Sequence, residues 1–307
     1  MVVKILKTDY KRGVEIARAA IEMKEQRRYP FNQPDIFPDA IVPEGVKVGS
    51  LEHALFLFYA CNFDSSQRAV VVYDSLRQIA SKIDLTLLAL MPPKEILKVF
   101  KPYMKKMGDP ERALLDPINT AHHNAIKLQQ EYGGDPRNLR ARTVQQTIDN
   151  ICHGKTRKYS AHKFRQYGIG KAALLMKNYV RFGMWDFSPY EIPIKVDRHL
   201  LRISVGSRVA ILQDESTRGR MDRVVDALTK LYQKVTLREK ISAVDLNDSF
   251  WAIGSYLCTR NNAINCHLSC DINCLNRPDV DKKLTWYYPK SEHRRDAENL
   301  FSYAKCK

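Results

Sequence analysis

Four of the seven cysteines in this chain lie close together in the sequence. They are Cys258, Cys266, Cys270 and Cys274, so four thiol groups fall within 17 positions. Four soft ligands at such short spacing suit a structural zinc ion or a cubane iron–sulfur cluster. The odd number of cysteines and the lack of a secretory signal argue against an extracellular disulfide framework. The sequence therefore predicts a metal centre, and both metals stay open at this point, with cysteines that bind no metal as the remaining alternative.

A second pattern places two glycines around one apolar residue, in the order Gly168, Ile169 and Gly170. Glycines permit a tight turn with unusual dihedral angles and let the backbone approach another surface closely. A helical run over 172–180 follows, and the N–H groups of its first turn have no partner within the helix. Those N–H groups, with Lys171 beside them, would form an anion site suited to a phosphate. Such a turn also occurs where two helices merely pack together.

The charge of the chain points the same way. Fifty Lys and Arg against 34 Asp and Glu give a formal net charge of +16. This surplus favours a polyanionic partner, although a generally basic surface is the plain alternative. No acidic residue lies between Asp149 and Asp186, and a stretch of one sign is expected on a surface that faces phosphates. The basic residues of this stretch are Lys155, Arg157, Lys158, Lys163, Arg165, Lys171, Lys177 and Arg181.

Helical periodicity dominates the elements that must position these residues. Apolar residues recur at helical spacing over 51–80 and again over 221–231, whereas alternation typical of a strand is confined to 192–196. Four prolines over 30–43 exclude a regular element there. No stretch is long and apolar enough to cross a bilayer, and the first residues lack the apolar core of a signal peptide. We therefore expect an all-α, intracellular protein, cytoplasmic or nucleoid-associated, that acts as a monomer without a membrane.

The hairpin and a segment downstream of it resemble one known family. Val196, Asp197, His199 and Arg202 occupy the places of a Val-Asp-x-His-hydrophobic-x-Arg segment that follows a Gly-hydrophobic-Gly hairpin. This combination is similar to the helix-hairpin-helix-Gly-Pro-Asp (HhH-GPD) DNA glycosylases, the group that includes endonuclease III. The resemblance extends to a helix ending in a glycine turn over 124–136, and to residues 55–64. It implies two helical subdomains with a DNA-binding cleft between them, one over 49–200 and one over 1–48 plus 201–307.

The resemblance also implies roles for particular residues. Asp197 matches the family's catalytic aspartate, which stabilises positive charge on the sugar, although an aspartate before a helix also serves as an N-cap. Asn62 or Phe63 would fill the gap left by a flipped-out base, whereas an aromatic residue at a helix end is more often core. Lys171 and Lys177 would contact phosphates. Bifunctional members carry a Schiff-base lysine where this chain has Ala172.

The position of the cysteines in the family favours a 4Fe–4S cluster over zinc, although their spacing here differs from the family's usual spacing. Arg260, between the first two cysteines, would touch the DNA backbone. The sequence thus predicts a monofunctional DNA glycosylase of base excision repair, acting on a damaged or mismatched base in duplex DNA. Three alternatives stay open: a bifunctional glycosylase/lyase that uses Lys171, a non-catalytic DNA-binding protein with the hairpin and cluster, and a glycosylase of free nucleosides or RNA.

Overall fold

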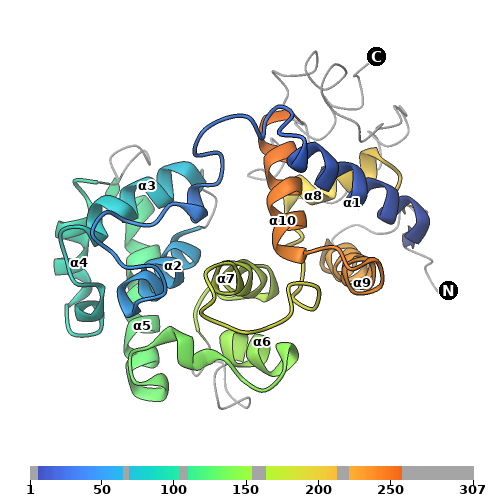
Figure 1. The fold of residues 1–307 in the computed structure, drawn as a ribbon. Coiled ribbons are helices and arrows are strands. Elements are labelled where there is room, and N and C mark those ends of the chain that lie inside the picture. The colour runs from blue at the N-terminus through green and yellow to red at the C-terminus, as the bar shows by residue number, and fades with distance from the viewer. Residues whose placement is uncertain (1–5, 65–68, 104–109, 154–163, 213–220, 258–307) are drawn as a thin grey trace. The chain divides into compact units, whose positions relative to one another are not determined.

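The computed structural model describes residues 6–64, 69–103, 110–153, 164–212 and 221–257. These residues are mostly helical, which confirms the all-α class. The chain forms two compact units (Figure 1): a middle unit of residues 37–188, and a terminal unit of residues 1–36 and 189–307. The divisions expected from the sequence lay at residues 49 and 200 and would have placed both the hairpin and Asp197 in the middle part of the chain. In the structure the hairpin belongs to the middle unit and Asp197 to the terminal unit.

The middle unit is built around one helix, α2 (Leu51–Phe63). Every residue of α2 from His53 to Phe63 is buried, as expected of a helix that is apolar on all sides. Its N-terminus is capped by Ser50, whose hydroxyl accepts the amide N–H of His53 at 3.3 Å. Helices α3, α5 and α7 and the short helices η2 and η4 all contact it (Figure 1). The other elements of this unit are η1 (Pro38–Ala40), α3 (Ala69–Ala80), η2 (Leu85–Ala89), α4 (Pro93–Phe100), α5 (Pro110–Tyr132), η4 (Pro136–Leu139), α6 (Val144–His153) and α7 (Ile169–Arg181).

One side of α2 receives hydrogen bonds from α7 and from the chain just before it. The acceptors are backbone carbonyl oxygens four residues apart, which places them along one face of the helix. The three pairs are Tyr179 Oη to Ala54 O at 2.7 Å, Tyr167 Oη to Phe58 O at 2.5 Å, and Lys171 Nζ to Asn62 O at 2.9 Å. These directional bonds fix how α7 lies along α2.

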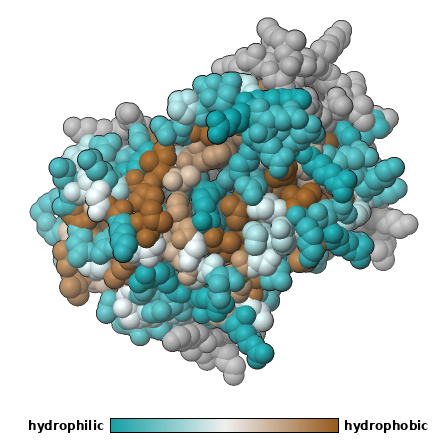
Figure 2. Space-filling model, in the orientation of Figure 1, coloured by the Kyte–Doolittle hydropathy of each residue, from teal (hydrophilic) through white to brown (hydrophobic). Residues whose placement is uncertain are grey.

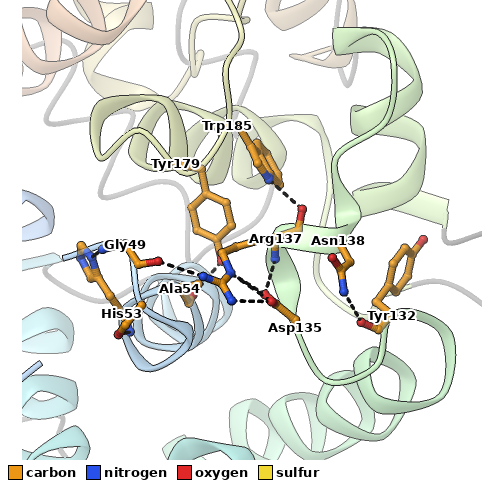
Figure 3. A network of polar contacts seen from close by, with 10 residues as sticks. Gly49, His53, Ala54, Tyr132, Asp135, Arg137, Asn138, Tyr179 and Trp185 are labelled. Carbon is orange, nitrogen blue, oxygen red and sulfur yellow. Dashed lines mark hydrogen bonds and ion pairs between the residues drawn. The ribbon is translucent and has the colours of Figure 1, made fainter. Parts of the chain in front are cut away.

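Arg137 of η4 ties the chain just before α2 to the chain just after α7 (Figure 3). Its guanidinium donates to the carbonyl oxygen of Gly49 at 2.9 Å and to both carboxylate oxygens of Asp135, with the shortest contact at 2.6 Å. Its own carbonyl oxygen accepts the indole N–H of Trp185 at 2.9 Å. Because the pair with Asp135 is bidentate and charged, it fixes the guanidinium in orientation as well as in place.

An ion cluster lies buried between η1 and α7. Lys177 Nζ pairs with one carboxylate oxygen of Asp39, and Arg181 Nη1 lies 3.3 Å from the other. Burial alone would raise the pKa of Asp39, but the positive charges of Lys177 and Arg181 outweigh it, so the pKa lies below its ordinary value. A depressed pKa means that this cluster stabilises the fold at neutral pH and that the stabilisation is lost as the pH falls through the folded-state pKa.

The terminal unit packs α1 (Tyr10–Glu25) against α9 (Met221–Glu239) and α10 (Ala243–Ala252). Its other elements are α8 (Arg198–Gly206) and η7 (Ile253–Leu257), and two short antiparallel strands, β1 (Leu6–Thr8) and β2 (Ala210–Leu212), paired with Leu6 opposite Leu212. The prediction of a strand over 192–196 is wrong. That segment is irregular, and the N–H of Lys195 donates to the side chain of Asn247 at 2.8 Å instead of to a neighbouring strand.

The face drawn in Figure 2 carries hydrophilic residues over much of its area, with hydrophobic residues among them. Within the described ranges, no helix combines the length and the apolar character needed to cross a membrane.

The Asp39 cluster gives the first testable prediction. Lys177→Met leaves a carboxylate buried beside Arg181 with part of its compensation removed, and we expect the free energy of unfolding at pH 7 to fall by about 3 kcal/mol. Chemical denaturation followed by circular dichroism measures it. Lys98 is the matched control, because its ion pair with Glu95 is exposed and Lys98→Met should change stability by less than about 0.5 kcal/mol. Equal effects of the two substitutions would contradict a stabilising role for the cluster.

Candidate functional site

The predicted hairpin leads directly into α7. Gly168 is the N-cap residue of that helix, with φ −107° and ψ −178°, and the N–H of Ala172 donates to its carbonyl oxygen at 3.0 Å. The unusual glycine dihedrals expected from the sequence are absent, because both glycines have backbone conformations that other residues adopt. The positive φ in this turn belongs to Gln166, at 59°.

Neither hairpin glycine is required by the packing of the middle unit. A Cβ atom added at Gly168 or Gly170 would meet no atom of the described residues within 4 Å, apart from its own neighbours in the chain. Ile169 between them is 56% exposed, although it is a large apolar residue. Among the residues that the structure describes, no side chain caps the N-terminus of α7. The glycines therefore leave the backbone N–H groups of this helix end open to a surface that approaches closely.

A buried pair of asparagines holds the chain that enters the hairpin. Asn124 of α5 accepts the N–H of Arg165 at 2.7 Å and donates to the carbonyl oxygen of Arg165 at 3.0 Å. The same amide donates to Asn62 Oδ1 at 2.6 Å, and Asn62 donates to the carbonyl oxygen of Pro117 at 3.4 Å. The side chain of Asn124 thus pairs with the backbone of Arg165 as a neighbouring strand would.

This network corrects the role expected for Asn62. Its side chain is completely buried and bridges α2 and α5, so it has no access to the gap left by a flipped base. Phe63, the alternative, is also buried, where it stacks on Phe100. In this structure Asn62 supports the hairpin from within the core.

The predicted phosphate contacts divide into two kinds. Lys171 is partly exposed beside the hairpin, and its ammonium donates to the carbonyl oxygen of Asn62 at the C-terminus of α2, where the helix dipole favours a cation. The structure corrects the phosphate contact expected of Lys177, because this residue is only 5% exposed and its charge is paired with Asp39. The stretch between Asp149 and Asp186 has no acidic residue in the sequence, but the fold places Asp39 beside it. We assign no phosphate to Lys177.

Asp197 of the terminal unit lies at the N-terminus of α8. One carboxylate oxygen accepts the N–H of His199 at 2.8 Å and that of Leu200 at 3.2 Å, so the predicted capping role is present. Burial would raise the pKa of Asp197, but the charge of Lys195 and the two backbone N–H donors outweigh it. The pKa therefore lies below its ordinary value, and the half-buried carboxylate is ionised at neutral pH.

Arg202 lies one turn further along α8, next to the side chain of His199 in the first turn. Arg202 Nη2 lies 2.6 Å from His199 Nδ1 and donates to the carbonyl oxygen of Gly254 at 2.6 Å. Nothing in the sequence indicated that Gly254 belongs to this group. Asn124 and Asp39 were also missed, and their signal is weak: each is one polar residue whose partner is far away in the sequence.

The predicted metal ligands Cys258, Cys266, Cys270 and Cys274, and Arg260, lie outside the described residues. Among the residues that are described, no group of three or more His, Cys, Asp or Glu side chains is placed to hold a metal ion. Cys61 and Cys152 are buried thiols in the middle unit.

Comparison with known proteins gives no family for this chain, so its function has to be inferred from its own residues. No protein-family model matches the chain, and no curated protein matches its sequence.

The open space at Gly170 gives the second prediction. Gly170→Ala should raise the free energy of unfolding by about 0.5–1 kcal/mol, because alanine restricts the unfolded chain and adds no clash. The matched control is Gly183→Ala just beyond the other end of α7, where φ is +66°, and there we expect a loss of about 1 kcal/mol. Thermal or chemical denaturation measures both. A loss of stability in Gly170→Ala would show that the fold itself needs this glycine.

Proposed function

We propose that this chain is a monofunctional DNA glycosylase of the helix-hairpin-helix kind, which hydrolyses the N-glycosidic bond of a damaged or mismatched base. The observation that carries the proposal is Asp197: a half-buried carboxylate, kept ionised and fixed in direction by two backbone N–H groups at the start of α8. Its place in the segment Val196–Arg202 is the place of the catalytic aspartate in the family that the sequence resembles.

The chemistry follows from the charge that develops in the reaction. Cleavage of a glycosidic bond builds positive charge on the sugar, and a fixed carboxylate stabilises that charge without reorganising. The same carboxylate accepts a proton from the water that attacks the sugar carbon. The amide donors and the charge of Lys195 keep Asp197 unprotonated, and this is the form that both roles need.

The hairpin is the proposed contact with the DNA backbone. Gly168 and Gly170 leave the N-terminus of α7 bare, and backbone N–H groups at a helix N-terminus bind phosphate well. The exposed Ile169 would lie against the sugar-phosphate backbone, and Lys171 adds a charge beside it. Such contacts hold the duplex without reading its sequence.

The surroundings of Lys171 favour a monofunctional enzyme over a glycosylase/lyase. A Schiff-base lysine needs a free amine lone pair to attack the sugar. Lys171 Nζ instead donates to a helix-end carbonyl oxygen, which stabilises the ammonium form. Ala172, at the position of the family's lyase lysine, is completely buried.

The cysteines Cys258, Cys266, Cys270 and Cys274 are proposed to hold a 4Fe–4S cluster. The fit rests on the chemistry of the donor set, since four thiolates are the ligands that such a cluster takes. The cluster would serve to hold the end of the chain in place. Arg260 would then contribute one phosphate contact.

A non-catalytic DNA-binding protein is the second candidate. The observation in its favour is that Asp197 already has a structural role as the N-cap of α8, which accounts for an aspartate there without chemistry. The two candidates differ in what removal of the negative charge does to excision.

The DNA contact is tested with the glycine variant described above. Gly170→Ala should weaken binding to an undamaged duplex by about tenfold, or about 1.4 kcal/mol, because the added methyl group separates the helix end from the phosphate. Fluorescence anisotropy at fixed salt measures the Kd. If Gly170→Ala is more stable than the wild type but binds DNA more weakly, this glycine is needed for DNA binding and not for folding. Unchanged affinity would remove the hairpin from the interface.

The chemistry is tested by removing one charge. Asp197→Asn keeps the shape and most of the capping, and we expect the single-turnover excision rate to fall about 100-fold or more while the Kd for the damaged duplex stays close to that of the wild type. Asp9→Asn is the matched control, because Asp9 caps α1 by accepting the N–H of Arg12 at 3.0 Å in the same unit. Full excision by Asp197→Asn would favour the non-catalytic protein.

Metal content tests the proposed cluster. Protein purified without oxygen should be brown and contain about four iron atoms per chain by elemental analysis. Stoichiometric zinc without iron would contradict the cluster and show that the chain binds zinc instead. Serine at Cys258 should lower the iron content, whereas serine at Cys306, outside the group of four, should not.

A further inference from the structure

A glycine in η7 lies directly against α8. η7 is a π-helical segment that continues α10, and such segments often occur at functional sites. A Cβ atom added at Gly254 would lie 2.4 Å from His199 Cβ and 2.9 Å from His199 Nδ1. His199 Cβ is attached to the backbone and cannot rotate away. Any side chain at position 254 therefore pushes the first turn of α8 away from η7.

Arg202 fastens the same contact with hydrogen bonds. Its Nη2 donates to the carbonyl oxygen of Gly254 at 2.6 Å and lies 2.6 Å from His199 Nδ1. Because a guanidinium has donors and no acceptor, Nδ1 must accept, and a neutral ring then carries its proton on Nε2. Nε2 lies 3.5 Å from the hydroxyl of Ser255, also in η7. One face of the first turn of α8 is thus held by the backbone and a side chain of η7.

The position of Asp197 depends on that same turn. The N–H groups that hold its carboxylate belong to His199 and Leu200. His199 therefore both rests on Gly254 through its side chain and orients Asp197 through its backbone. A shift of the turn of a few tenths of an ångström to one ångström would displace the carboxylate relative to a reacting sugar.

We propose that Gly254 and Arg202, acting through His199, are positioning residues that set the direction of the Asp197 carboxylate for the excision reaction. The inference rests on the proposed function of Asp197. Gly254 and Arg202 touch neither the substrate nor the Asp197 carboxylate, and their effect on the excision rate passes through His199. A misplacement of one ångström at a reacting group can cost about 100-fold in rate.

The test measures the single-turnover rate constant with full-length protein in excess over a duplex carrying the base that the wild type removes. This rate constant reports the folded, bound protein, so a partial loss of folded protein leaves it unchanged as long as the folded protein stays in saturating excess over the duplex. Gly254→Ala should slow it by about tenfold or more, while the Kd stays within about threefold. Arg202→Lys should slow it in the same direction, because an ammonium cannot reproduce the planar guanidinium contact.

The terminal unit offers two controls away from α8. Gly13→Ala makes the same substitution in α1, where the Cβ would lie 3.4 Å from Leu231 Cδ2, close to an ordinary contact. Leu231→Ala removes a buried side chain and lowers stability. Neither should change the rate constant.

The outcomes separate this inference from the proposed function. If the wild type excises its base and Asp197→Asn does not, but Arg202→Lys and Gly254→Ala keep the wild-type rate constant, the positioning role alone is overturned. If Gly254→Ala does not fold, Arg202→Lys decides by itself. If the wild type removes no base from any duplex, the proposed function fails and the inference fails with it.

Discussion

The middle unit depends on the burial of α2, which is complete from His53 to Phe63. A helix buried on every side must be surrounded by other elements, and α3, α5 and α7 surround it. Hydrophobic burial is not directional, so it does not decide how α7 lies along α2. The directional part comes from the donors Tyr179, Tyr167 and Lys171, which bond to carbonyl oxygens one turn apart. The hairpin is therefore placed by the core.

This arrangement holds the hairpin turn in place without help from Gly168 and Gly170, which the packing of the fold does not require. Asn124 pairs with the backbone of Arg165, and Lys171 is bonded to the end of α2, so both sides of the turn are fixed. The glycines between them have open space around the missing side chains. A rigid turn with an exposed backbone is suited to binding a partner at close range, because little ordering remains when it binds. The proposed DNA contact follows from this combination.

The sequence predicted well what depends on local pattern. The apolar period predicted α2, α3 and α9, the glycine turn after Tyr132 occurs as Gly133 and Gly134 with positive φ, and Asp197 caps α8. It failed where the partner comes from a distant part of the chain. Lys177 looked like a phosphate ligand because its neighbours in sequence are basic, but Asp39 lies 138 residues away and neutralises it. Asn62 was expected to fill the gap left by a flipped-out base, but α5 buries it.

The central claim is that the ionised carboxylate of Asp197 supports removal of a base from DNA without cutting the strand. The most direct measurement incubates the wild-type protein with a panel of duplexes, each with one damaged or mismatched base, and then treats half of each sample with alkali. The account predicts that at least one duplex is cut after alkali and remains intact without it, and that borohydride traps no covalent adduct. Intact strands after alkali across the whole panel would contradict the claim, and so would strand cleavage without alkali.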